Sequence, residues 1–188
     1  MSGKLLHKLR LYLYRKWRYS RYNFFFLVPF VSQKDKELND ILDGVCNLAV
    51  AKGFKFTKPN IRLVCKDIGE NHSHWLNGKL IAKTKVVALA LGSDLIVIYW
   101  ATKHKLDKME LAVVVAHELG HIIDHQTNRI GHPLFDNIRH LDDEMFAHAI
   151  AAFLYSKLVV WSAYQKTGVA RFNFDAFIRL NLKIDAPL

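Results

Sequence analysis

The sequence is poor in cysteine and in long apolar runs, and each shortage excludes a class of protein. Its 188 residues include only two cysteines, Cys46 and Cys65. Two cysteines in a chain of this length support neither a disulfide framework nor a cysteine-based zinc site, so we expect free, buried thiols in a reducing compartment. No stretch approaches the roughly 20 apolar residues that a membrane-spanning helix needs.

Acidic residues are missing from the first 34 positions. The first is Asp35, and eight basic residues precede it: Lys4, Lys8, Arg10, Arg15, Lys16, Arg18, Arg21 and Lys34. The formal net charge of the chain is +10, so the part after the arm carries only about +2. Aromatic residues lie among these charges, at Tyr12, Tyr14, Trp17, Tyr19 and Tyr22. We interpret residues 1–34 as a basic-aromatic N-terminal arm.

The composition of this arm favours an anionic partner. Residues 4–22 suit a nucleic acid, with its phosphates and stackable bases, or an anionic membrane surface. A solvated tail and a segment packed on the domain are the alternatives. The apolar run from Phe24 to Val31 is too short for a signal peptide, is interrupted by Pro29 and lacks a small-residue cleavage site after it. We therefore expect a cytoplasmic protein, with peripheral membrane association as the alternative.

Residues 35–188 are expected to form one folded domain. The whole chain is 51% hydrophobic and 23% charged, as in globular proteins, and it shows no internal repeat. Apolar spacing predicts a helix from Asp35 to Gly53, followed by a strand at residues 61–65. Asn77-Gly78 predicts a tight hairpin, and residues 86–91 and 95–100 predict a second one. Together these segments indicate an α+β fold with a small, mostly antiparallel sheet.

A long helix is predicted from Asp107 to about Gln126. Asp107 offers an N-cap and Glu110, three residues later, completes a capping box ahead of an apolar run. Gly120 lowers the helix propensity by about 1 kcal/mol relative to Ala, so we expect it to mark a close approach of another element.

A second long helix is predicted after a polar loop that contains Gly131 and Pro133. Asp142 or Asp143 can cap its start, and Gly168 can serve as the residue that ends it. Residues 175–182 predict one last short helix.

The long helix carries a metal-binding pattern, His117-Glu118-Leu119-Gly120-His121. Positions i and i+4 share one face of a helix, so His117 and His121 can present two imidazole nitrogens to a single zinc ion. Glu118 is one residue round from His117, in position to act as the general base of a hydrolytic reaction without completing the ligand set.

A catalytic zinc needs a third protein ligand, and the sequence narrows its source. The metzincin pattern requires glycine and histidine at positions that hold Asp124 and Thr127, which excludes that class. Glu144 begins the next apolar helix, 23 residues after His121, as in the gluzincin arrangement. His140 is the best spare ligand if Glu144 does not bind.

These motifs resemble those of the ImmA/IrrE-type zinc metallopeptidases. The likeness covers roughly residues 107–156, including His125 after the first motif and the run from Glu144 through Ala147 to Ala152. It implies a minimal zincin-like fold in which a small sheet packs on the active-site helix and on a following Glu-bearing helix. It also implies that His117, His121 and Glu144 bind zinc and that Glu118 is the catalytic base.

His148 departs from the family pattern, which has Asn or Asp there. We assign it a candidate catalytic role, either orienting a ligand or stabilising a tetrahedral oxyanion, against the alternative of a partly buried structural histidine. Asp124 shares the face of His117, so it can accept a hydrogen bond from a ligand imidazole or remain solvated.

We therefore expect a zinc-dependent metallopeptidase with a protein substrate. The resemblance implies a restricted substrate, such as a transcriptional regulator, bound as an extended strand along residues 86–91 or 95–100. The alternative is a non-catalytic zincin-like protein that acts on nucleic acid or a membrane surface through its arm. A secreted or membrane-surface protease-like effector is the third hypothesis.

Overall fold

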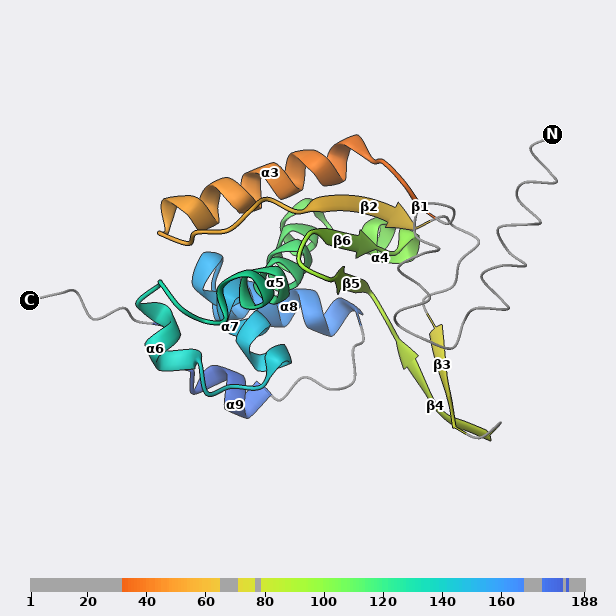
Figure 1. Ribbon diagram of the computed structural model, residues 1–188. Helices are drawn as coiled ribbons and strands as arrows, with labels where there is room; N and C mark the ends of the chain where they lie inside the picture. Colours follow the sequence, from red (N-terminus) through yellow and green to blue (C-terminus); the bar gives the residue numbers. More distant parts are fainter. Residues whose placement is uncertain (1–31, 65–70, 77–78, 168–173, 181, 183–188) are drawn as a thin grey trace, which may run out of the picture.

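The computed structural model describes residues 32–64, 71–76, 79–167, 174–180 and 182. In these residues the chain has an α+β fold (Figure 1). The strands are β1 (Ser32–Gln33), β2 (Asn60–Val64), β3 (Asn71–Leu76), β4 (Lys79–Lys85), β5 (Ala88–Leu91) and β6 (Leu95–Ile98). The helices are α3 (Lys36–Ala51), α4 (Trp100–Lys105), α5 (Lys108–Thr127), α6 (Leu134–Ile138), α7 (Asp143–Leu154), α8 (Lys157–Thr167) and α9 (Phe174–Ile178).

The main sheet is mixed, with the strand order β1-β2-β6-β5. β1 and β2 are antiparallel, as are β5 and β6, but β2 and β6 run parallel. The predicted second hairpin is confirmed by the pairing of β5 with β6. The parallel pair of β2 and β6 differs from the expected hairpins, because it joins strands that are far apart in the sequence.

A separate antiparallel ribbon is formed by β3 and β4, and it extends away from the main sheet (Figure 1). Its register pairs Leu76 with Lys79, which agrees with the tight hairpin predicted at Asn77-Gly78. The two turn residues themselves lie outside the described part of the chain, as does Cys65.

The N-terminal arm was predicted to end at residue 34. Residues 1–31, including the basic-aromatic stretch, lie outside the described residues. Ser32 and Gln33 form β1 and pair with Val64 and Leu63 of β2. The end of the predicted arm is therefore part of the sheet.

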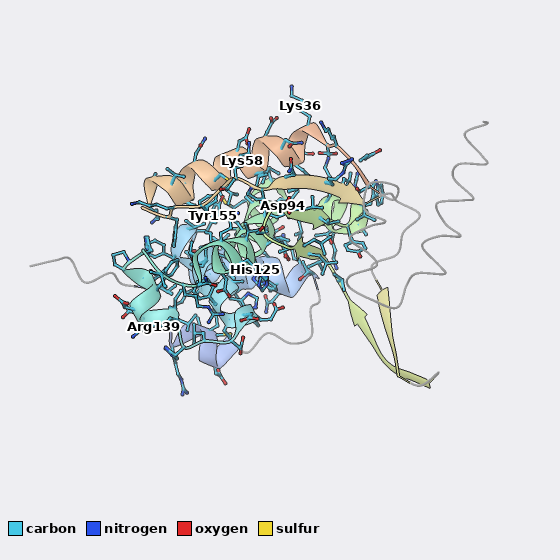
Figure 2. All side chains as sticks on the ribbon, viewed as in Figure 1. Lys36, Lys58, Asp94, His125, Arg139 and Tyr155 are labelled. Atoms are coloured by element: carbon cyan, nitrogen blue, oxygen red, sulfur yellow. The ribbon has the colours of Figure 1, made fainter. Side chains whose placement is uncertain are left out.

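One face of the sheet packs against the helices. Alternate residues of the strands, such as Ile61, Leu63, Ile96 and Ile98, join one core with α3, α5 and α7. Residues of the opposite alternation form a second, smaller cluster: Val64, Leu91, Val97 and Tyr99. Successive side chains of a strand point to opposite faces of the sheet. The helices therefore cover the face that carries Ile61, Leu63, Ile96 and Ile98. Figure 2 shows Lys36 at the start of α3 pointing away from this core.

The helix α3 begins as the sequence predicts. The Asp35 carboxylate accepts a hydrogen bond from the Leu38 N–H at 3.0 Å, which satisfies a donor at the helix start. Lys103 of α4 forms ion pairs with Asp35 at 2.7 Å and with Glu37 at 2.9 Å. This cation therefore fastens α4 to the N-terminal turn of α3.

The long helix α5 has the predicted capping box. The Glu110 N–H donates to Asp107 at 2.9 Å, and the Asp107 N–H donates to the Glu110 carboxylate at 3.0 Å. Glu110 is buried, and its carboxylate also pairs with Lys166 of α8. The capping box therefore fixes the start of α5 and ties this helix to α8.

The other end of α5 is fixed by Gln126. Its side-chain amide accepts a hydrogen bond from the Thr57 N–H at 2.6 Å and donates to the Thr57 carbonyl at 3.0 Å. It also donates to the carbonyl of Ser93, in the turn between β5 and β6, at 2.6 Å. One side chain thus connects the last turn of α5 to two segments of the sheet side of the domain.

Several predicted boundaries were wrong. The strand expected to reach Trp100 ends at Ile98, and Trp100 begins α4. The loop before the second helix contains α6. The last helix, α9, ends at Ile178 instead of residue 182. No helix in the described ranges is long and apolar enough to cross a bilayer.

The second helix was predicted to run to Gly168, and it is in fact two helices. α7 ends at Leu154 and α8 begins at Lys157. Between them, the Ser156 hydroxyl accepts a hydrogen bond from the Val159 N–H at 3.3 Å. Serine is a strong N-cap, so it starts a new helix where the apolar spacing alone continues the old one. Gly168 lies outside the described residues.

Candidate metal centre

The two helices that carry the site pack closely against each other at Gly120. A Cβ at this position would lie 2.7 Å from the Cα of Ala147 on α7. Side chains do not tolerate such a distance, so the helices approach this closely only because position 120 has no side chain. The predicted close approach at Gly120 is therefore confirmed. It brings His117 and His121, on either side of Gly120, to the start of α7.

Three donor groups meet at this contact. The Nε2 atom of His117 lies 3.4 Å from Oε2 of Glu144, and Nε2 of His121 lies 3.8 Å from the same oxygen. The ligand atoms of the three residues all lie within 4.8 Å of one another. Among the described residues, this is the one group of three or more His, Cys, Asp or Glu side chains with such a spacing.

The spacing of the three donors suits a small tetrahedral ion. Ligand atoms about 2.1 Å from a zinc ion at tetrahedral angles are about 3.4 Å apart. The two histidine-to-glutamate distances, 3.4 and 3.8 Å, lie close to this value. Two imidazoles and one carboxylate are also a donor set that zinc takes in hydrolytic sites. The residues present therefore fit a zinc ion.

The three ligand candidates differ in exposure. The side chain of His117 is 6% exposed and that of His121 18%, whereas the Glu144 side chain is 68% exposed. The imidazole of His117, and then that of His121, holds the pKa of Glu144 far below its ordinary value. Glu144 is thus an anion over the physiological pH range and faces solvent on one side. The site is buried on its histidine side and open on its glutamate side.

Glu118 is buried beside the candidate metal ligands. It follows His117 on α5 and is 5% exposed, although an isolated buried carboxylate is costly. Burial raises the pKa of Tyr164 well above 10, and the charges of Glu118 and Glu144 raise it further. The Tyr164 hydroxyl, on α8, therefore stays protonated beside both carboxylates.

His148 is buried against the ring of His117. The two ring centroids are 4.4 Å apart, and the ring of Tyr164 meets His148 edge-on at 4.6 Å. Burial lowers the pKa of His148 to about 2, with His117 and His121 adding to the effect and Glu144 opposing it, so the imidazole is neutral. This position behind a ligand candidate favours an orienting role over direct contact with a substrate. That role stays a prediction.

The other histidines near the motif lie elsewhere. Those of residues 125 and 140 are exposed, and Figure 2 shows His125 on α5. His132 is buried in a structural position, where its Nδ1 accepts from the Leu134 N–H and its Nε2 contacts the Lys52 carbonyl at 2.9 Å. None of the three belongs to the group of metal-binding spacing in the described part of the chain.

The Asp124 carboxylate has a partner that its sequence position did not suggest. Its carboxylate receives two hydrogen bonds from Arg129, at 2.8 Å from Nε and at 2.7 Å from Nη2. The same guanidinium donates to Asp143, the residue before Glu144, at 2.7 Å. Arg129 could not be found from the sequence, because no spacing rule connects an arginine in a loop to acidic residues on two helices.

Arg129 holds an unusual backbone conformation. Its φ is 59° and that of the preceding Asn128, the C-cap of α5, is 49°. A left-handed conformation costs a residue other than glycine roughly 1–2 kcal/mol. The Arg129 N–H also donates to the Thr127 hydroxyl at 3.2 Å. The surrounding hydrogen bonds therefore maintain a strained turn directly after the helix that carries the histidines.

Comparison of the chain with protein-family models, with curated proteins and with solved structures finds no match. The assignment of the site therefore depends on the residues and on their geometry. That geometry establishes a group of two histidines and one glutamate, carried by α5 and α7, that could hold a metal ion.

Proposed function

We propose that this protein is a zinc-dependent metallopeptidase. The observation that carries the proposal is the meeting of His117 and His121 on α5 with Glu144 on α7, all within 4.8 Å at their ligand atoms. Glu118 lies one residue from the first histidine on the same helix. A purely structural metal site needs no buried carboxylate beside its ligands, so Glu118 favours a catalytic site over a structural one.

Each residue of the site has its own role in the proposed reaction. Zinc in such a site supplies Lewis-acid activation of water and of the scissile carbonyl. His117, His121 and Glu144 would hold the ion, and the Glu144 side chain is 68% exposed to solvent. Glu118 accepts the proton of the attacking water and passes it to the leaving amine. His148 packs against the ring of His117, with the centroids 4.4 Å apart, and would limit the rotation of that ring.

The sheet supplies a place for the substrate. β5 is an edge strand of the described sheet and packs on α5, whereas β6 is an interior strand. Of the two candidate substrate-binding strands, the one at residues 86–91 is therefore the one with no further strand beside it among the described residues. An extended peptide that adds to β5 would run beside the helix that carries the histidines. This supports a polypeptide substrate.

The resemblance to the ImmA/IrrE-type enzymes extends the proposal to the kind of substrate. A restricted protein substrate in a regulatory setting, such as a transcriptional regulator, fits better than general digestion. We also propose that the protein is cytoplasmic. Its basic N-terminal arm would bring the enzyme to DNA or to a membrane surface.

The first experiment is elemental analysis of purified protein after dialysis against a mild chelator. We compare the wild type with Glu144→Ala and with Glu37→Ala. Glu37 also lies in the first turn of a helix and is exposed, so it controls for the loss of one such charge. We expect one zinc per chain in the wild type and in Glu37→Ala, and loss of zinc in Glu144→Ala, His117→Ala and His121→Ala.

Two other outcomes would change the assignment. Tight zinc in Glu144→Ala would remove Glu144 from the ligand set and direct attention to His140 or His148. A wild type without zinc would contradict the proposed enzymatic activity. The main question would then be what the N-terminal arm binds. In that case, salt-dependent association with nucleic acid or with anionic vesicles would support the non-catalytic alternative.

A further inference from the structure

Arg129 uses every N–H group of its guanidinium. Nε donates to Asp124 at 2.8 Å, and Nη2 donates to Asp124 and to Asp143, both at 2.7 Å. Nη1 donates to two backbone carbonyls, that of Arg139 at 3.0 Å and that of Leu141 at 2.5 Å. A guanidinium has five N–H donors, and all five are engaged here.

These five hydrogen bonds join three segments around the candidate metal centre. Asp124 lies on α5, three residues after His121. Residues 139 and 141 belong to the connection that leads from α6 to α7. Asp143 is the first residue of α7 and directly precedes Glu144. Arg129 therefore connects the helix of the two histidines to the turn that carries the third ligand.

The Arg129 guanidinium also stacks on an aromatic ring. Its Cζ atom lies 4.5 Å from the centre of the Phe146 ring, and Phe146 is fully buried in the core. The Arg129 side chain is 15% exposed, so water competes weakly for its hydrogen bonds. Glu144, by contrast, is 68% exposed and would otherwise be free to choose among rotamers. Arg129 contacts the side chains of Asp143, directly before Glu144, and of Phe146, two residues after it, and so limits this freedom.

We propose that Arg129 is a positioning residue that places Glu144 for metal binding. This inference rests on the proposed zinc site. A lysine cannot replace the arginine, because an ammonium group has three donors and no planar fork to match a carboxylate and two carbonyls together. The bidentate bond to Asp124 sets the orientation of the guanidinium, and the opposite edge then fixes the start of α7.

The test compares Arg129→Met with Lys103→Met in the full-length protein. Lys103 is a matched control, because it is 14% exposed and joins two acidic residues, yet it connects α4 to α3. The zinc dissociation constant is measured by competition with a chromophoric chelator, and the thermal midpoint of the metal-free protein by circular dichroism. We expect both variants to lower the midpoint, and Arg129→Met alone to raise the zinc dissociation constant, by about 10–100-fold.

Two results would overturn the inference: a zinc dissociation constant of wild-type size in Arg129→Met, or an equal rise in Lys103→Met. A wild type that binds no zinc would instead contradict the proposed function, and this is seen before any variant is measured. Arg129→Lys should not restore wild-type affinity, because the fork is lost while the charge remains.

A milder substitution covers the case in which Arg129→Met does not fold. Asp143 is 80% exposed, so Asp143→Ala removes one hydrogen-bond partner of Arg129 without disturbing the core. We expect it to weaken zinc binding severalfold in the wild type and to have little further effect in the Arg129→Lys background, since the two residues act together. Equal weakening in both backgrounds would mean that Asp143 acts on the metal through its own charge, and would overturn the inference.

Discussion

Gly120 of α5 faces the backbone of Ala147 of α7 so closely that an added Cβ would lie 2.7 Å from the Ala147 Cα and 3.1 Å from its carbonyl oxygen. Backbone atoms of a buried helix cannot move aside as a flexible side chain can. The close approach of α5 and α7, the helices that carry the candidate ligands, therefore requires glycine at this position.

Gly120→Ala should separate the helices and destabilise the protein, even though alanine is the better helix former. We expect the free energy of unfolding to fall by about 1–3 kcal/mol, as for other overpacked cores. Urea denaturation followed by circular dichroism measures it. Gly44→Ala is the control, because Gly44 lies in α3 with no atom within 4 Å of the added Cβ. That substitution should stabilise the protein by about 0.5–1 kcal/mol.

Glu118→Gln should separate metal binding from catalysis. The substitution keeps the shape of the side chain but removes the base, so the zinc content should match the wild type while hydrolysis falls by about a hundredfold to ten thousandfold. Zinc is measured by elemental analysis, and cleavage by mass spectrometry on a peptide library. Loss of zinc in this variant would place Glu118 among the ligands instead.

The ion pair at the start of α3 predicts a specific pH dependence. Partial burial works to raise the pKa of Asp35, but hydrogen bonds from Lys103 and from the Leu38 N–H outweigh it, so the pKa lies below its ordinary value of 3.8. A carboxyl group with a depressed pKa stabilises the fold above pH 3.8, and this contribution is lost as the pH falls through the depressed value.

Asp35→Asn keeps a good N-cap but removes the charge. We expect it to lower the free energy of unfolding at pH 7 by about 0.5–1 kcal/mol, with the difference from the wild type shrinking in acid. Urea denaturation at a series of pH values measures this. Asp40→Asn, exposed on the same helix, should show no such trend. A difference for Asp35→Asn that stays constant down to the most acidic conditions would contradict the assignment.

The thiol of Cys46 should be unreactive in the folded protein. Cys46 is buried on α3, and burial raises its pKa to about 11, with Asp43 adding to the effect and Lys58 opposing it. At pH 8 about one thiol in a thousand is then ionised, so iodoacetamide should label it far more slowly than a free cysteine. Mass spectrometry in the Cys65→Ser background measures the rate. Labelling at the rate seen in concentrated urea would contradict the burial.

Local signals in the sequence predicted those parts of the fold that depend on neighbouring residues. The capping box of Asp107 and Glu110, the hairpin of β5 and β6, and the close contact at Gly120 all follow from short patterns. The grouping of the two histidines with Glu144 also agrees with the prediction, because the i and i+4 spacing fixes the histidines and one helix start supplies the glutamate.

Features that depend on distant contacts were missed. The parallel pairing of β2 with β6 joins residues such as Ile61 and Ile96, which no local pattern relates. The break between α7 and α8 was missed for a different reason: its signal is local, but Ser156, which caps the new helix, lies within a continuous apolar pattern. Arg129 was missed because its partners are brought together only by a left-handed turn.

The three hydrogen bonds of Gln126 have a consequence for how a substrate would bind. They join the last turn of α5 to Thr57 and to Ser93, in the turn that follows the edge strand β5. The turn that follows the proposed docking strand is therefore hydrogen-bonded to the helix that carries His117 and His121. These bonds exist before any peptide arrives, so we expect the entropy cost of binding to fall mainly on the peptide that pairs with β5.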